Sequence, residues 1–330
     1  RCWLKSFGLT RKWCGSSSVA LPLRPAVAGG LKAEPASRTP SGGEAPQTKM
    51  VPQVQLGEFG PDPKGAGPSD DPILMPALGY GIGTAWFRAE GDASKAQALK
   101  SCIKQALDLG FRHLDDAEMY ENCRITGSAV REWLLEGDTP KESSTRRKRS
   151  DLFITQKVDN FDAQPIQDTC DTLLEKMGLE YFDLFLLHSP FNRKTSQPYA
   201  KPLKDAWREM QQLVVSRKVR AVGVSNFRIQ DLEQVLSACE ACDETPAAGI
   251  RPVCNQVEGN PFLQQAGLLE FCSREKITLT VYGPQLPVTR SWETAPGPGP
   301  SAGGGADAAV PPLVPTGRYF TSAGPEAAPG

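Results

Sequence analysis

The stretch that decides the fold is LFITQKVDNFDAQPIQDTCDTLLEKMGLEYFDLFLLH, residues 152–188. It opens with the apolar run Leu152–Val158 and closes with a second run, Asp183–His188, each of a length typical of a buried strand. Between them apolar residues recur at helical spacing, at Ile166, Cys170, Leu173, Leu174 and Met177. Gly178 follows this stripe as a helix-ending signal. The stretch therefore predicts two parallel strands joined by a helical crossover.

The same alternation continues on both sides of this unit. Further strands are predicted near Leu78–Gly83 and at His113–Ala117, Val219–Ser225, Val253–Val257 and Thr278–Tyr282. Helical stripes lie between strands, at Leu99, Ile103, Ala106 and Leu107, and again at Leu203, Ala206, Trp207, Met210 and Leu213. Repeated strand–helix units predict a parallel sheet, either doubly wound or closed into a barrel.

The glycines near the first strand favour the barrel. A doubly wound dinucleotide-binding sheet would carry G-x-G-x-x-G at the start of its first helix. Gly79-Tyr-Gly-Ile-Gly83 lacks that spacing and precedes no convincing helix. We therefore predict an α/β protein with a (β/α)8 TIM barrel.

The C-terminal part of the predicted barrel is incomplete. After Thr289-Arg290 we find no recognisable eighth strand or final helix, and residues 291–330 are dominated by Pro, Gly and Ala. The expected domains are a mostly disordered N-terminal extension over 1–73, the barrel over 74–290 and a disordered tail over 291–330. A barrel without one strand has two open edges, so we expect low stability or weak activity.

Composition and charge limit the compartments in which the chain could act and the partners that it could bind. Residues 1–50 are basic and rich in Ser, Ala, Gly and Pro, which partly resembles a transit peptide, although upstream sequence wrongly joined to the frame is an equal alternative. We expect a cytoplasmic monomer, or a mitochondrial one if that segment is genuine. The formal net charge of -1 argues against nucleic-acid binding. No apolar run approaches the ~18 residues that a membrane span requires.

The sequence has few residues suited to a metal site or to a framework of disulfides. The chain has two histidines, and its nine cysteines are scattered, with one C-x-x-C pair at Cys239 and Cys242. We interpret the cysteines as reduced thiols, because no second ligand pair or thioredoxin-like context accompanies them.

Polar residues occur where the predicted strands end. These are Asp115, Lys157, His188, Ser225, Asn226, Asn255, Gln256 and Tyr282. Ionisable groups in apolar strands are costly unless they are paired, and the functional site of a barrel lies at the carboxyl ends of its strands. We therefore predict that these residues form one site.

The residue types suit carbonyl reduction. Tyr120 could donate a proton to the developing alkoxide, but the ordinary pKa of a phenol, ~10, is high for this role. A cationic Lys157 would lower that pKa, Asp115 would hold Lys157, and His188 would orient the substrate oxygen. Simpler structural roles stay open, such as a salt bridge from Asp115 to Arg112 or Arg124.

Five segments resemble the hallmarks of one family, the aldo-keto reductases. They are 110–122 (GFRHLDDAEMYEN), 152–157 (LFITQK), 183–190 (DLFLLHSP), 222–227 (VGVSNF) and 255–258 (NQVE), within a resemblance that covers roughly residues 75 to 290. The resemblance implies the catalytic group Asp115, Tyr120, Lys157 and His188, with a small-molecule carbonyl substrate and no metal.

The resemblance also implies a nicotinamide cofactor. Ser225, Asn226 and Gln256 would hydrogen-bond its carboxamide, and Tyr282 would stack on its ring. His188 would contact the substrate oxygen. By their position after the first strand, Trp86 and Phe87 could line the substrate pocket, and packing at the rim of the barrel is an equal alternative. The cofactor implied is NADPH, with NADH left open, because the basic loop that grips the adenosine phosphate in the family is not recognisable here.

Two motifs point to a branch of the family. His188-Ser-Pro and Tyr282-Gly-Pro, with Gly83-Thr-Ala-Trp-Phe87, resemble the motifs of the subgroup that reduces conjugated polyketones and ketopantoyl lactone.

Two alternatives to an active reductase stay open. One is a non-catalytic relative that binds nucleotide, and the other is a truncated, inactive gene product.

Overall fold

The structure is a computed structural model that describes residues 17–20, 51–56, 73–136, 147–240, 247 and 249–286. Its centre is a curled sheet of parallel strands: β4 (Leu78–Gly81), β5 (His113–Asp115), β6 (Phe153–Val158), β7 (Phe182–Leu187), β8 (Val219–Ser225), β9 (Cys254–Glu258) and β10 (Thr278–Tyr282). Each strand falls within one residue of its predicted run or inside it. The predicted barrel architecture is therefore confirmed.

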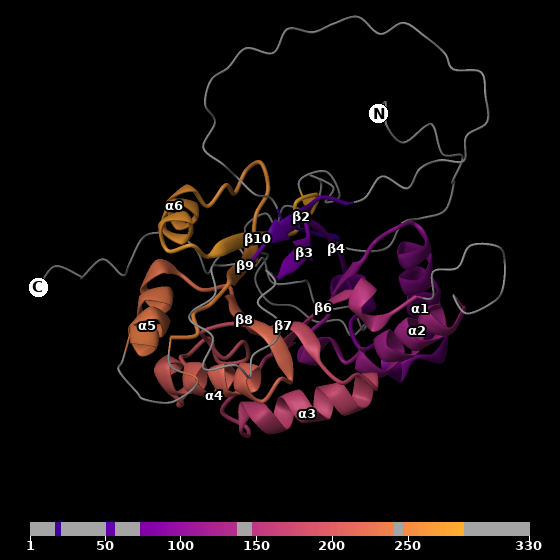
Figure 1. The fold of residues 1–330 in the computed structure, drawn as a ribbon, viewed down its shortest axis with the longest axis horizontal. Helices are drawn as coiled ribbons and strands as arrows, with labels where there is room; N and C mark the ends of the chain where they lie inside the picture. The colour runs from indigo at the N-terminus through magenta and orange to yellow at the C-terminus, as the bar shows by residue number, and fades with distance from the viewer. Residues whose placement is uncertain are drawn as a thin grey trace, which may run out of the picture.

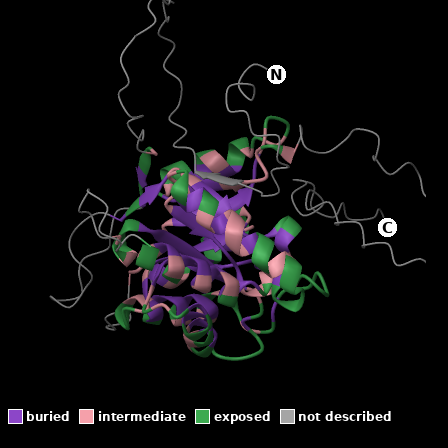
Figure 2. Ribbon diagram, turned by 90° about the vertical axis from the view of Figure 1, so that its right-hand side faces the viewer, coloured by how far each residue is buried: buried purple, intermediate pink, exposed green. Residues whose placement is uncertain are grey.

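Helices surround this sheet on its outer side (Figure 1): α1 (Ala93–Asp108), α2 (Cys123–Glu136), α3 (Ile166–Met177), α4 (Leu203–Val215), α5 (Ile229–Glu240) and α6 (Ala266–Arg274). The predicted stripes of α1, α3 and α4 are buried against the strands, apart from half-buried Leu203. Figure 2 shows buried strands at the centre and exposed outer helix surfaces. Burial of these stripes, at roughly 25 cal/mol per Å² of apolar surface, is the main force that holds helices on the sheet.

Alternation along each strand sends successive side chains to opposite sides of the sheet. On β6 and β7, Ile154 and Leu187 belong to the large core under the helices, whereas Phe153 and Leu186 belong to a second, inner cluster. Lys157 is an even number of residues from Phe153, and His188 from Leu186, so both side chains point into the barrel. The inward pattern of the strands therefore brings ionisable groups to the inside.

A short hairpin adds to the inner cluster. Strands β2 (Gln53–Gln55) and β3 (Leu74–Pro76) pair antiparallel, separately from the main sheet. Their neighbours Leu56 and Ile73, with Met75, pack against inward-facing residues of β6 to β9. The hairpin is thus joined to the barrel interior by apolar contact.

The position of an eighth strand is taken by residues near the N-terminus. Strand β1 (Ser17–Ala20) lies antiparallel between β10 and β4, and it closes the hydrogen-bonded ring. The sequence predicts two open edges, and the structure differs because backbone groups of any extended segment can pair with such edges. No eighth parallel strand follows β10 among the described residues, and the predicted tail, 291–330, lies outside them.

Candidate active site

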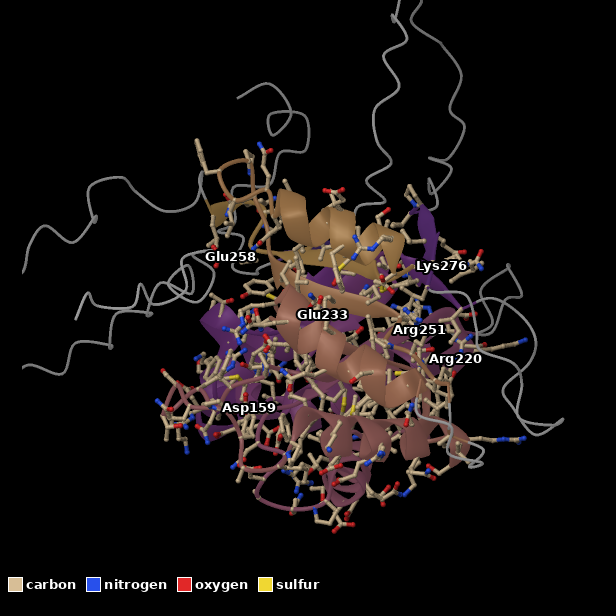
Figure 3. The ribbon with its side chains drawn as sticks, turned by 90° about the vertical axis from the view of Figure 1, so that its left-hand side faces the viewer. Asp159, Arg220, Glu233, Arg251, Glu258 and Lys276 are labelled. Atoms are coloured by element: carbon tan, nitrogen blue, oxygen red, sulfur yellow. The ribbon has the colours of Figure 1, made fainter. Side chains whose placement is uncertain are left out.

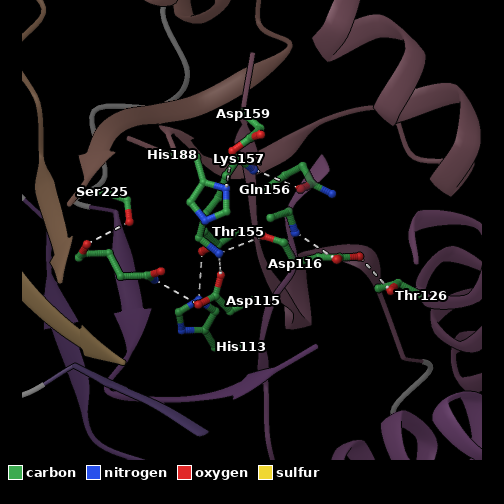
Figure 4. Close-up of polar contacts among 12 residues, drawn as sticks. His113, Asp115, Asp116, Thr126, Thr155, Gln156, Lys157, Asp159, His188 and Ser225 are labelled. Atoms are coloured by element: carbon green, nitrogen blue, oxygen red, sulfur yellow. Dashed lines mark hydrogen bonds and ion pairs between the residues drawn. The ribbon is translucent and has the colours of Figure 1, made fainter. Parts of the chain in front are cut away.

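Asp115 and Lys157 form the centre of the site. Lys157 Nζ makes an ion pair with Asp115 Oδ1 and donates to the backbone oxygen of Asp116 at 2.9 Å (Figure 4). Gln256 Nε2 donates to Asp115 Oδ2 at 2.9 Å, which ties β9 to β5 across the barrel. The side chains of Lys157 and Asp115 are only 1% and 4% exposed, so each needs the other to remain charged. In place of the simpler alternative, a salt bridge to Arg112 or Arg124, Asp115 is paired with Lys157, and Arg112 Nη1 donates to the backbone oxygens of Leu107 and Phe111.

Tyr120 lies beside this pair. It ends the short 3-10 helix η4 (Glu118–Tyr120), and its ring centroid is 5.3 Å from Lys157 Nζ. The ring also meets the His188 ring edge-on, with the centroids 5.8 Å apart. Gly83 makes the approach of the β4 loop possible, because a Cβ there would lie 2.8 Å from Tyr120 Cζ. The structure therefore brings together all four residues predicted to be catalytic.

The electrostatic balance keeps Tyr120 protonated. Burial raises the pKa of Tyr120, and although Lys157 lowers it, as the sequence predicts, the net pKa lies above its ordinary value of 10.0. Burial opposes the charge on Lys157, but Asp115 and Tyr120 outweigh it and raise the pKa of the ammonium. At neutral pH a phenol therefore faces a cation.

The predicted cofactor residues form a hydrogen-bonded chain at the ends of β8, β9 and β10. Ser225 Oγ donates to the Gln256 backbone oxygen at 2.8 Å, and Asn226 Nδ2 donates to the His188 backbone oxygen at 2.9 Å. Tyr282 Oη donates to Asn226 Oδ1 at 2.8 Å. Amide and hydroxyl groups beside a half-buried tyrosine ring fit the carboxamide and flat ring of a nicotinamide.

The two aromatic residues after β4 lie differently from one another. Trp86 is 7% exposed and packs in the core under the helices, whereas the ring of Phe87 is 5.6 Å from that of Tyr120. Asn122 holds this loop, because its Nδ2 donates to the backbone oxygens of Ile82 and Trp86. Of the two aromatics, Phe87 is the one in contact with a predicted catalytic residue.

Sequence reasoning missed two aspartates near the site. Asp116 is fully buried and accepts hydrogen bonds from the Ala117 amide and Thr126 Oγ1, both at 2.8 Å, which joins β5 to α2. Asp159 follows β6 and faces His188 at 3.6 Å. Position was the signal that could have found them. Asp116 directly follows Asp115 and points to the opposite side, whereas Asp159 is two residues after Lys157 and points to the same side.

Figure 3 shows the two ends of the barrel. Asp159 and Glu258, at the carboxyl ends of β6 and β9, lie on one side, opposite the labelled basic residues Arg220, Arg251 and Lys276, at the amino ends of β8, β9 and β10. The site lies at the carboxyl ends, as in other barrels.

Among the described residues, no group of three or more His, Cys, Asp or Glu side chains could hold a metal ion. The described helices include none long and apolar enough to cross a membrane.

The sequence model of the Aldo/keto reductase family matches residues 79–286, which contain every residue of this site. The chain belongs to the aldo/keto reductase family. It is 33% identical over 235 residues to aldose reductase B of Dictyostelium discoideum, a match that covers 66% of this chain and 68% of that one. It is 34% identical over 224 residues to the NADPH-dependent alpha-keto amide reductase of Saccharomyces cerevisiae, covering 66% and 64%.

Solved structures of the reductase family share the fold. A Bombyx mori aldo-keto reductase in complex with NADP aligns with a TM-score of 0.58 at 25% identity, covering 76% of this chain and 72% of that one. An aldo-keto reductase complexed with NADPH aligns at 0.55 with 26% identity, covering 69% and 61%. The chain spans about two thirds of the length of the first curated relatives, between 62% and 68%.

Proposed function

We propose that this chain reduces an aldehyde or ketone to an alcohol with NADPH, and that Tyr120 is the general acid. The observation that carries the proposal is the contact of half-buried Tyr120 with buried Lys157 and His188, with Lys157 paired to Asp115. Two solved relatives bind NADP or NADPH, and one curated relative is an NADPH-dependent reductase. The bound nicotinamide would supply the hydride.

The residues of the chain would manage the proton. Tyr120 is protonated at neutral pH, so its hydroxyl can donate to the oxygen that gains negative charge, and the nearby Lys157 counteracts the rise in its pKa that burial causes. The Lys157 ammonium would stabilise the phenolate that this donation leaves. Asp115 and Gln256 hold the ammonium in place, and His188 would orient the carbonyl oxygen.

On the cofactor side, Ser225, Asn226 and Gln256 would hold the carboxamide while Tyr282 covers one face of the ring. Trp86 and Phe87 form the aromatic segment after β4 that would border the substrate. We also propose that the reductase unit is 74–290, with 1–73 and 291–330 as extensions, the first of which adds strands β1 and β2 to this unit, and that the chain acts as a monomer. The His188-Ser-Pro and Tyr282-Gly-Pro motifs favour conjugated diketones or ketolactones as substrates.

The substitution Tyr120→Phe tests the function, with NADPH oxidation followed against a panel of such carbonyls. We expect kcat to fall by about 10²–10⁴-fold, the usual contribution of a general acid, while NADPH binding by fluorescence is unchanged. Tyr181→Phe is the matched control, because Tyr181 lies outside the site against Arg149. A parent that binds nucleotide but turns over no carbonyl would support the alternative, a non-catalytic relative.

A further inference from the structure

Asp159 and His188 present two buried polar atoms to each other. Asp159 Oδ1 is 3.6 Å from His188 Nδ1, and the two side chains face one another at the carboxyl ends of β6 and β7 (Figure 4). Among the described residues, neither atom has a hydrogen-bond partner, although Arg193 Nε lies 3.5 Å from the same Asp159 oxygen. A buried carboxylate oxygen that faces a ring nitrogen is unfavourable unless a proton lies between them.

The backbone holds this pair in place. The His188 amide donates to the Val158 oxygen at 2.9 Å, and the His188 oxygen accepts from Asn226 Nδ2. The Asp159 amide donates to Glu118 Oε2 at 2.8 Å. Small side-chain rotations would therefore bring the two atoms within hydrogen-bond distance without moving either strand.

The charges around the pair determine where a shared proton would reside. The charged or titratable groups around it are Glu118 and Tyr120 on η4, Lys157 on β6, and Arg193, Lys194 and Tyr199 after β7. Burial raises the pKa of Asp159, although Arg193 and Lys194 lower it. Burial, Arg193 and Lys157 hold the pKa of His188 well below its ordinary value. Both directions disfavour the ion pair of a carboxylate with an imidazolium, so a proton shared by Asp159 Oδ1 and His188 Nδ1 leaves the pair neutral.

We propose that Asp159 is a positioning residue that shares one proton with His188 Nδ1 and so leaves Nε2–H free to donate to the substrate carbonyl oxygen. This inference rests on the proposed reductase function, in which His188 orients the carbonyl. When the shared proton is lost to solvent at higher pH, the ring proton moves to Nδ1 to bond the carboxylate. Nε2 then presents a lone pair to the carbonyl oxygen, and orientation fails.

The substitution Asp159→Asn separates this role from a merely structural one. An amide can donate to Nδ1 at every pH, so we expect turnover near neutral pH to be retained and the alkaline decline of kcat/KM to move upward by about one pH unit or more. Asp159→Ala has no donor and should lose kcat by about 10²-fold, the cost of misplacing a reacting group. Asp205→Asn on α4, an exposed carboxylate paired with Arg208, is the control and should leave the profile unchanged.

A second measurement, NMR of the histidine rings, does not depend on enzyme activity. The chain has two histidines, so ¹⁵N-labelled histidine gives one signal set for His188 and one for His113, which serves as an internal reference. In the parent we expect His188 to change from the Nε2–H to the Nδ1–H tautomer as the pH rises, whereas Asp159→Asn should keep Nε2–H. A parent ring that keeps one tautomer at all pH values, or the same titration in both proteins, overturns the proposal. An inactive parent with the expected tautomer change would instead contradict only the reductase function.

Discussion

The buried polar residues of the barrel interior are stable only in combination. Lys157 alone would be an uncompensated charge, and removal of one partner from such a pair typically costs about 3–5 kcal/mol. Asp115 neutralises it, Gln256 satisfies the second carboxylate oxygen, and the Asp116 backbone accepts a further bond. This mutual dependence explains why the strands can carry ionisable side chains in an apolar core.

Asp116 should make the stability of the fold pH-dependent. Burial raises the pKa of its carboxyl from 3.8 to about 6, so the folded state holds the proton more tightly than the unfolded state. The stabilisation is present below pH 3.8 and is lost as the pH rises through about 6. We expect the parent to lose about 3 kcal/mol relative to Asp116→Asn between these limits, as measured by urea unfolding. A difference between the two proteins that does not vary with pH would contradict this.

Helices α2 and α3 approach each other more closely than most side chains would allow. A Cβ at Gly127 would lie 2.1 Å from the Met177 backbone oxygen at the end of α3. Alanine at 127 must therefore push the two helices apart and disturb the packing of both on the sheet. Close packing at this contact is a property of the pair of helices, not of either sequence alone.

We expect Gly127→Ala to lower the free energy of unfolding by at least about 1–3 kcal/mol, the usual cost of overpacking. Gly267→Ala in α6 is the matched control, because a Cβ there meets nothing within 4 Å. That change should be neutral or stabilising by up to about 1 kcal/mol, since glycine is a poor helix former. Chemical denaturation of both variants checks the contrast, and equal effects would show that the helix contact does not control stability.

Closure of the barrel joins segments from distant parts of the chain. Strand β1 pairs through Val19 with Val281 of β10 on one side and with Leu78 of β4 on the other. Without this strand the edges of β4 and β10 would expose unpaired backbone groups. The stability of the whole ring should therefore depend on a segment far from the site.

The substitution Val19→Pro tests this closure, because proline has no backbone N–H and cannot donate within the ring. We expect a loss of about 1–3 kcal/mol, the cost of leaving backbone groups unpaired. Hydrogen exchange should speed up at residues 78–80 and 280–281, which pair with β1. Val19→Thr, which keeps the backbone N–H and is also β-branched, is the control. Unchanged exchange in Val19→Pro would show that β1 does not close the barrel in solution.

Much of the architecture could be predicted from local sequence. Runs such as Asp183–His188 and stripes such as that of α3 depend only on the periods of strands and helices, and the predicted boundaries agree with the structure within one or two residues. Strand-end positions likewise predicted which polar residues would meet. Trp86 shows the limit, since no local pattern in the sequence told how far its ring would be buried, and in the folded chain it is 7% exposed.

The amino-acid sequence by itself determined the barrel class and the meeting of Asp115, Lys157 and His188, because these follow from periodicity and from the common edge at which parallel strands end. Only the tertiary structure decided what these groups face. The effect of burial on the pKa of Tyr120 exceeds the opposite effect of Lys157, so that pKa is raised. Asp159 comes within 3.6 Å of His188, and β1 closes the ring. The physical reason is that burial, distance between side chains and pairing of remote edges depend on the assembled molecule, and no local pattern contains them.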